Sequence, residues 1–133
     1  MGGVRLTVRV DFASDRALGP GKIRLLEAIG KTGSISRAGR ALGMSYRRAW
    51  LLVDDMNRSF RAPVVTTQPG GARGGGAALT PFGAALIEKY RMIEARATKA
   101  AKPHLRALET SLRRRAGGKQ KSLKTSIRAV AAR

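Results

Sequence analysis

Four adjacent side chains suited to contacting nucleic acid are Ser45, Tyr46, Arg47 and Arg48. An arginine can donate two hydrogen bonds to O6 and N7 of a guanine, which discriminates against other bases by about 1–3 kcal/mol. A tyrosine can contact a thymine methyl group or a phosphate. A serine at a helix start can hold a phosphate together with the backbone N–H groups beside it. These residue types indicate a DNA-contacting surface, provided that a helix presents them to a groove.

The segment that follows has the pattern of such a helix. Ser45 is a favourable N-cap residue for a helix over about 46–60. We expect its inner face to be apolar and Trp50 to lie in the core. That inner face comprises Ala49, Trp50, Leu52, Val53 and Met56. Tyr46, Arg47 and Arg48 then cannot all be buried. The alternative is that Arg47 and Arg48 belong only to a solvated helix face.

Two further helices are predicted before it. Pro20 suits the first turn of a helix over about 20–30, and Ser34 can cap a shorter one over about 35–42. Gly43 suits a left-handed C-cap, and Gly39, four residues earlier, would let two helices cross closely. Two helices joined by a tight turn are a helix-turn-helix, whose second helix enters the major groove with its N-terminal residues facing the bases.

Strand patterns flank this helical region. Residues 5–12 alternate apolar and polar side chains and predict one half-buried strand, followed by a break from Asp15 to Gly19. Val64–Thr67 and Ala77–Thr80 predict a hairpin around a glycine-rich loop that carries Arg73. Arg73 could reach a phosphate or a narrow minor groove, although the hairpin could also have no role. The predicted fold is α+β, mostly helical: a winged helix-turn-helix.

A long helix is predicted to begin at Pro81, and we expect Pro103 to end or kink it. Apolar residues recur along it at spacings of three and four, which is typical of a helix–helix seam. We therefore expect a dimerisation helix. The predicted interface residues are Leu86, Tyr90, Ile93, Ala97, Leu105 and Leu108. The sequence therefore predicts three regions: a DNA-binding domain over 1–80, a long helix over 81–115 and a disordered basic tail over 116–133.

Charge favours a polyanionic partner. The 133 residues include 27 Lys and Arg but only 8 Asp and Glu, so the net charge is +19. Eight of the basic residues lie in 113–133, so the rest of the chain is also strongly basic. Nucleic acid is the first candidate and an anionic membrane the second. The tail could add DNA affinity that does not depend on sequence, could only solubilise the chain, or could form a weak membrane-surface helix.

Several other classes are disfavoured. Cysteine is absent, which excludes disulfides and thiolate metal sites and fits an intracellular location. No apolar run approaches the roughly 20 residues that cross a bilayer. The single histidine, His104, has no carboxylate cluster near it in the sequence. We therefore expect no catalytic residues, no metal and no cofactor, and a cytoplasmic, nucleoid-associated location.

The most specific motifs are the stretches 33–36, 42–50, 56–57, 74–77 and 79–83. Taken together, these stretches resemble the N-terminal domain of the molybdate-responsive transcriptional regulators, the ModE family, and more distantly the LysR-type helix-turn-helix. The resemblance covers about residues 18–100.

The resemblance implies a winged-helix dimer that binds a palindromic operator. It implies that Ser45, Tyr46, Arg47 and Arg48 lie at the DNA. It also places Ser34, Ser36 and Arg73 near the DNA backbone. Full-length members of the family also carry a C-terminal β-rich molybdate-binding region. Because the residues after Tyr90 are helical or low in complexity, we expect no molybdate binding by this chain.

We therefore expect a dimeric, sequence-specific double-stranded DNA-binding transcriptional regulator that lacks a molybdate-sensing domain. An architectural, nucleoid-associated DNA-binding protein is the first alternative, favoured by the charge. A partner that modulates a full-length regulator through the long helix is the second. An enzyme is disfavoured because no catalytic constellation is visible.

Overall fold

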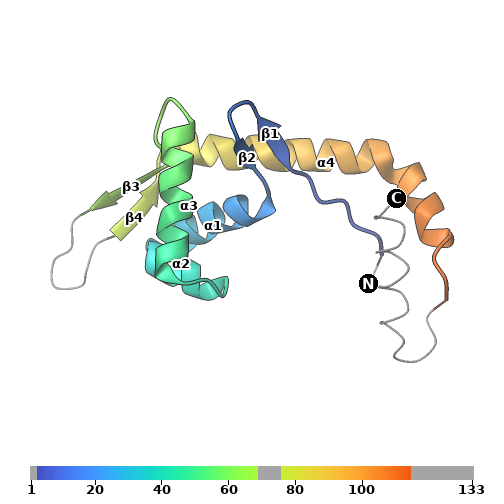
Figure 1. The fold of residues 1–133 in the computed structure, drawn as a ribbon, viewed down its shortest axis with the longest axis horizontal. Helices are drawn as coiled ribbons and strands as arrows, with labels where there is room; N and C mark the ends of the chain where they lie inside the picture. Colours follow the sequence, from blue (N-terminus) through green and yellow to red (C-terminus); the bar gives the residue numbers. More distant parts are fainter. Residues whose placement is uncertain (1–2, 69–75, 115–133) are drawn as a thin grey trace. The chain divides into compact units, whose positions relative to one another are not determined.

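The structure is a computed structural model that describes residues 3–68 and 76–114. These residues divide into two compact units, Leu6–Lys99 and a smaller one that contains residues 3–5 and 100–114. Figure 1 shows the elements along the chain. In order, they are β1 (Val10–Phe12), β2 (Arg16–Leu18), α1 (Pro20–Thr32), α2 (Ile35–Ala41), α3 (Tyr46–Ser59), β3 (Val65–Gln68), β4 (Gly76–Leu79) and α4 (Pro81–Thr110).

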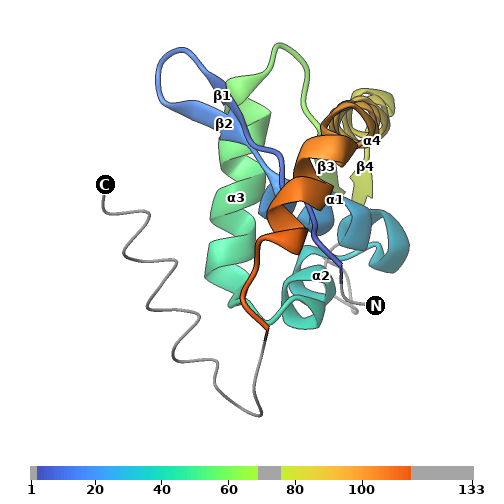
Figure 2. The ribbon, with the colours of Figure 1, turned by 90° about the vertical axis from the view of Figure 1, so that its right-hand side faces the viewer.

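Helices α1, α2 and α3 form the core of the larger unit, as the sequence predicts. Pro20 occupies the first turn of α1, and Gly33 ends this helix in the left-handed conformation, with φ of 69°. The apolar side of α1 packs entirely inside, with Ile23, Leu26 and Ile29 fully buried. Figures 1 and 2 both show α2 on the side of α1 that is away from α4. The predicted helices are confirmed, and their ends differ by only one or two residues.

The turn between α2 and α3 brings the two helices close together. Gly43 adopts φ of 72°, a conformation that glycine accepts without strain. The N–H of Met44 donates to the carbonyl of Gly39 over 2.9 Å. A Cβ atom at Gly39 would lie 3.0 Å from the Cβ of Ala49, so a larger residue there would push α3 away. The predicted role of Gly39 in a close crossing is confirmed.

The N-terminal segment differs from its prediction. Residues 5–12 do not form one strand, and Asp15–Gly19 is not only a break. Instead, β1 and β2 pair as a short antiparallel hairpin. Ser14 and Asp15 reverse the chain in the left-handed conformation, with φ of 64° and 61°. The hairpin is held to the end of α3, because the Phe12 ring meets the edge of Phe60 at 6.0 Å and Arg16 donates to the carbonyl of Ser59.

Strands β3 and β4 form the hairpin that the sequence predicts, here called the wing. They pair antiparallel from Val65 opposite Leu79 to Gln68 opposite Gly76. The wing rests on α1, where Leu79 lies beside Gly30 and the N–H of Ala77 donates to the carbonyl of Gly33. Residues 69–75, which include Arg73, lie outside the described residues, as does the predicted tail over 116–133.

Helix α4 begins where the sequence predicts. The hydroxyl of Thr80 accepts the N–H of Gly83 over 2.9 Å and so caps the helix. Gly83 is buried so closely against Val64, the residue before β3, that a Cβ there would overlap the carbonyl oxygen of Val64. The helix does not end at Pro103, since it continues through this residue to Thr110.

An ion pair fastens α4 to α1. Arg91 donates to both carboxylate oxygens of Glu27, over 3.0 and 2.8 Å, and to Glu94 over 2.7 Å. The hydrogen bond from Arg91 lowers the pKa of the Glu27 carboxyl below its usual value. This clamp fixes the first turns of α4 against the domain that carries α3.

Candidate nucleic-acid interface

The first turn of α3 presents two arginines to solvent. The Ser45 hydroxyl accepts the N–H of Arg48 over 3.1 Å and satisfies one of the unpaired donors at this helix start, as predicted. Arg47 and Arg48 are both exposed. Among the described residues, neither guanidinium group has a hydrogen-bond or ion-pair partner. Their charge is therefore available to an external anion.

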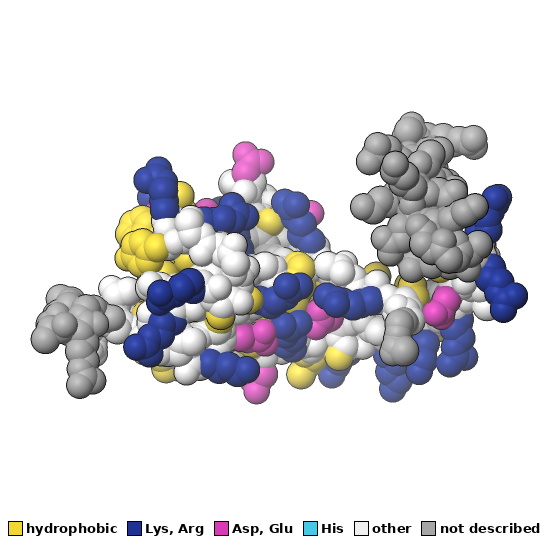
Figure 3. Space-filling view, turned by 90° about the horizontal axis from the view of Figure 1, so that it is seen from below, with side chains coloured by type: hydrophobic (Ala, Val, Ile, Leu, Met, Phe, Trp, Pro, Cys, Tyr) yellow, Lys and Arg dark blue, Asp and Glu magenta, His cyan; other side chains and the backbone are white. Residues whose placement is uncertain are grey.

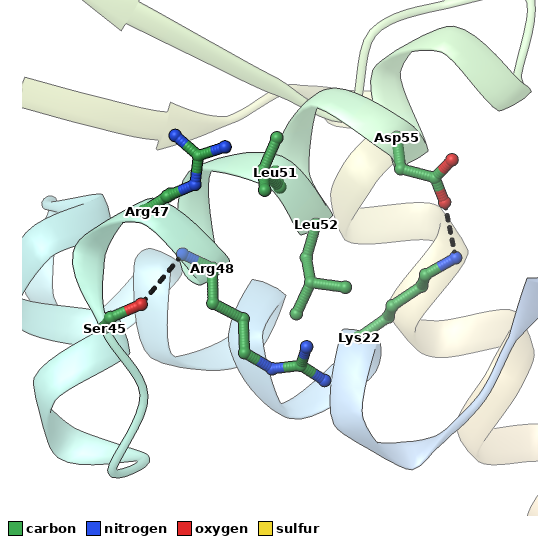
Figure 4. Close-up of a pocket in the computed structure, with 7 residues that line it drawn as sticks. All are labelled: Lys22, Ser45, Arg47, Arg48, Leu51, Leu52 and Asp55. Atoms are coloured by element: carbon green, nitrogen blue, oxygen red, sulfur yellow. Dashed lines mark hydrogen bonds and ion pairs between the residues drawn. The ribbon is translucent and has the colours of Figure 1, made fainter.

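A shallow hollow of about 340 Å³ lies beside this turn. Figure 4 shows that Arg47 and Arg48 leave α3 in different directions, with Arg48 running toward the part of α1 that carries Lys22. Lys22 donates to the Asp55 carboxylate over 2.7 Å and to the carbonyl of Ala17 over 2.8 Å. Lys22 therefore joins α1 to α3, whereas the two arginines remain exposed and unpaired among the described residues.

The second half of α3 is held by internal contacts. Asp54 accepts two hydrogen bonds from Arg58, and Asp55 pairs with Lys22. These two carboxylates would repel a phosphate backbone, so DNA contact is favoured at the N-terminal half of the helix. Because Arg58 is paired with Asp54, the unpaired positive charge of α3 lies in its first turn.

Asn57 connects α3 to the wing. Its side-chain oxygen accepts the N–H groups of Val64, over 2.7 Å, and Val65, over 3.2 Å. Its side-chain nitrogen donates to the carbonyl of Val65 over 3.1 Å. Sequence reasoning noted Asn57 only as part of a motif and missed this positioning role. The sequence does contain a signal for this role: Asn57 is an amide side chain beside the apolar face of the predicted helix, shortly before the predicted strand.

Trp50 is not a core residue, which corrects the prediction. Trp50 is 44% exposed, and Leu51 is 47% exposed. Ala49, Val53 and Met56 are buried and Leu52 packs partly buried against the same core, so only Trp50 departs from the predicted inner face. Together with Tyr46, which is 58% exposed, Trp50 and Leu51 leave apolar surface close to the two arginines.

The other predicted DNA contacts have separate positions. Ser34 caps α2 by accepting the N–H of Arg37 over 3.0 Å, and Ser36 is exposed in the first turn of that helix. Arg73 lies outside the described residues. Seen from below, Lys and Arg side chains predominate over acidic ones, and a yellow apolar area lies among them (Figure 3). The described surface is thus basic well beyond α3.

The predicted interface residues of α4 fall into two groups. Tyr90 is 1% exposed and donates its hydroxyl to the carbonyl of Val8 over 2.6 Å, so it belongs to the core of its own chain. Leu86 is half-buried against the same core. Ile93 and Leu108 are exposed, and Ala97 and Leu105 are half-buried. Of the six, only Tyr90 is excluded as a contact for a partner by its burial.

The part of the chain that the structure describes offers neither a membrane-spanning helix nor a metal-binding cluster. No helix within 3–68 and 76–114 is long and apolar enough to span a bilayer. In the same residues, no group of three or more His, Cys, Asp or Glu side chains could hold a metal ion.

Comparison with known proteins gives matches to the region that carries α1 to the start of α4. Residues 21–84 match the family model of the bacterial regulatory helix-turn-helix protein, lysR family. The chain is 55% identical over 78 residues to the molybdenum-pterin-binding protein MopB of Rhodobacter capsulatus, which covers 59% of this chain and 29% of MopB.

Two further relatives show the same coverage pattern. Identity is 40% over 96 residues with the molybdenum transport protein ModE of Azotobacter vinelandii, covering 71% of this chain and 36% of that protein. It is 39% over 74 residues with the DNA-binding transcriptional dual regulator ModE of Escherichia coli strain K12, covering 56% and 28%. The chain spans about a third of the length of these relatives.

Proposed function

We propose that this chain, whose residues 21–84 are a helix-turn-helix domain of the lysR family, is a sequence-specific double-stranded DNA-binding protein that regulates transcription. The single observation that carries this proposal is the first turn of α3. Arg47 and Arg48 are exposed there, and no carboxylate among the described residues pairs with them. Two guanidinium groups at the start of the second helix of a helix-turn-helix are placed to pair with guanine edges in the major groove.

Several features support the same assignment. Ser45 and the start of α3 offer donors for a backbone phosphate, and Ser36 is exposed on α2. Asn57 holds the wing at a defined place beside α3. The net charge of +19 would speed association with DNA. The relative in Escherichia coli is named a DNA-binding transcriptional dual regulator.

The protein acts as a homodimer in this proposal. Ile93, with the half-buried Ala97, supplies apolar surface for a second copy in the larger unit, and Leu108, with the half-buried Leu105, supplies it in the smaller one. A two-fold dimer would set two α3 helices about 34 Å apart, or a multiple of that distance, along one face of DNA. Analytical ultracentrifugation of the full chain should give twice the monomer mass.

We further propose that the chain acts on DNA in the cytoplasm, is not an enzyme, and binds no molybdate through its own 133 residues. Residues 81–110 form one helix, which offers no β-rich oxyanion site. Titration calorimetry with molybdate should therefore give no binding heat, and molybdate should not alter DNA affinity. A saturable heat with the purified chain would contradict this part of the proposal.

The direct test of sequence recognition is selection from random duplexes at physiological salt. The full chain and a version lacking residues 113–133 should both enrich the same two-fold-symmetric motif. Enrichment of no motif, with affinity that collapses when the basic segment is removed, would contradict the proposal.

That second outcome would favour an architectural DNA-coating protein. The observation in its favour is the charge, because phosphate neutralisation alone gives tight binding to any duplex. Such a protein should show equal affinity for unrelated duplexes and a steep fall of affinity with salt.

A further inference from the structure

Trp50 stands exposed at an unusual place. It is the only tryptophan of the chain, and it is 44% exposed. Tryptophan carries a large apolar surface, which is normally buried in a core or an interface. Leu51, the next residue, is 47% exposed. Two large apolar side chains therefore leave α3 from neighbouring columns without a covering element among the described residues.

The position of Trp50 on α3 follows from the helical repeat. Tyr46 lies four residues before it, one turn nearer the helix start, and Asn57 lies seven residues after it, two turns on. Asn57 bonds to β3, so this side of α3 is the side of the wing. Arg47 precedes Leu51 by one turn on the neighbouring column. Each apolar side chain thus continues a column that begins with a predicted DNA contact.

From this arrangement we infer that Trp50 contacts a thymine methyl group in the major groove, with Leu51 beside it. The inference rests on the proposed function and deepens it. The C5 methyl of thymine is the apolar group that B-DNA displays in the major groove. An exposed apolar pair next to Arg47 matches a site in which a thymine lies beside a guanine. Trp50 is then a specificity-determining residue, and it removes its own apolar surface from water only when DNA is bound.

Because Trp50 is the only tryptophan, its own fluorescence reports on the contact. Adding the selected duplex to the full chain should change both the intensity and the wavelength of emission, at the same concentrations at which a gel shift appears. Binding seen by gel shift with unchanged emission overturns the inference and leaves the proposed function standing. An emission change that follows protein concentration without DNA overturns it in favour of a partner subunit covering Trp50. Absence of binding to any duplex overturns the proposed function and the inference together.

Replacement of single thymines by deoxyuridine removes only the methyl group. At one thymine, or two adjacent ones, per half-site, this change should weaken binding by the full chain about three- to tenfold. Trp50→Ala should bind the unmodified duplex with a similarly reduced affinity and should no longer respond to the deoxyuridine. Trp50→Phe should retain part of the response. Met92→Ala is the matched control, because Met92 is 46% exposed on α4, and it should respond to deoxyuridine as the wild type does.

The contrary results are equally definite. Equal affinity for all deoxyuridine duplexes overturns the inference, and so does a Trp50→Ala variant that keeps the wild-type response. The deoxyuridine series on the unaltered chain decides the matter even where Trp50→Ala fails to fold, which a thermal melt of the variant would reveal.

Discussion

The two halves of α3 use the same kinds of residue for different purposes. In the first half, Arg47 and Arg48 have no partner among the described residues, and Trp50 is exposed. In the second half, Arg58 is paired with Asp54, and Asn57 makes two hydrogen bonds to Val65 of β3 and one to Val64 just before it. The polar side chains of the second half are thus tied into the fold, whereas those of the first turn are exposed to solvent. Substitutions in the first half should therefore change binding, and those in the second should change stability.

The largest effect is expected from removing both unpaired arginines. The double variant Arg47→Ala, Arg48→Ala should lose about 2–4 kcal/mol of affinity for the selected duplex, or roughly 30- to 1,000-fold, because each arginine contributes to base discrimination. Its thermal midpoint should stay near that of the wild type, since neither side chain has a partner to lose. Fluorescence anisotropy with labelled duplex, together with a thermal melt, measures both quantities. A large fall in the melting temperature would contradict the claim that the first half of α3 affects DNA binding and not stability.

A substitution in the second half of α3 should instead lower the stability of the fold. Asn57→Ala leaves the N–H of the fully buried Val64 without its acceptor, which should cost about 1–3 kcal/mol of unfolding free energy. Denaturant titration followed by circular dichroism measures this loss. Asn57→Asp retains the acceptor for both N–H groups and should recover part of the stability. Full stability of Asn57→Ala would contradict the role assigned to this side chain.

A smaller loss of stability is expected from removing the N-cap of α3. Ser45→Ala removes the cap on the N–H of Arg48 and should reduce stability by about 1 kcal/mol. It should also weaken DNA binding, because the same hydroxyl lies where a phosphate would approach. Ser45→Asp is the informative counterpart: it should restore the cap and the stability, yet bind DNA worse because of its charge. A Ser45→Asp variant that binds DNA as tightly as the wild type would place the phosphate elsewhere.

The smallest effect concerns the acid that faces the hollow. Asp55→Asn removes a negative charge near the first turn and weakens the hold on Lys22, which lies 2.7 Å from Asp55. DNA affinity should rise about two- to fivefold at low salt, with a steeper salt dependence. Asp11→Asn is the matched control, since Asp11 is an exposed acid paired with Arg9 on the N-terminal hairpin. An equal gain from both variants would mean that only the net charge matters.

Most of the helical framework was predictable from local signals. Pro20, Ser34 and Ser45 mark helix starts, and Gly43 ends a helix in the left-handed conformation that glycine accepts; the first helix, predicted to end at about residue 30, instead continues through Gly30 to Thr32 and ends at Gly33. These signals act within a few residues, so one sequence reveals them. The wing was predictable for the same reason, because β-branched residues stand at one side of a glycine-rich loop.

The errors arose where tertiary contacts decide. The N-terminal hairpin turns at Ser14 and Asp15, where no glycine signals a positive φ, and its place is set by the ring of Phe60 far along the chain. Trp50 borders an apolar helix face, and periodicity alone cannot tell where that face ends. The position of Ala49 against Gly39 turns the helix so that Trp50 faces outward. Tyr90 likewise fits a seam by spacing, but its hydroxyl bonds to Val8 within its own chain.

The central claim is that the first half of α3 reads DNA sequence. Parallel selections from one pool of random duplexes, with the wild-type chain and with the Arg47→Ala, Arg48→Ala variant, test it most directly. The account predicts a two-fold-symmetric motif for the wild type and none for the variant at the same protein concentration and salt. The same motif enriched by both proteins would contradict the claim, and so would enrichment of no motif by either.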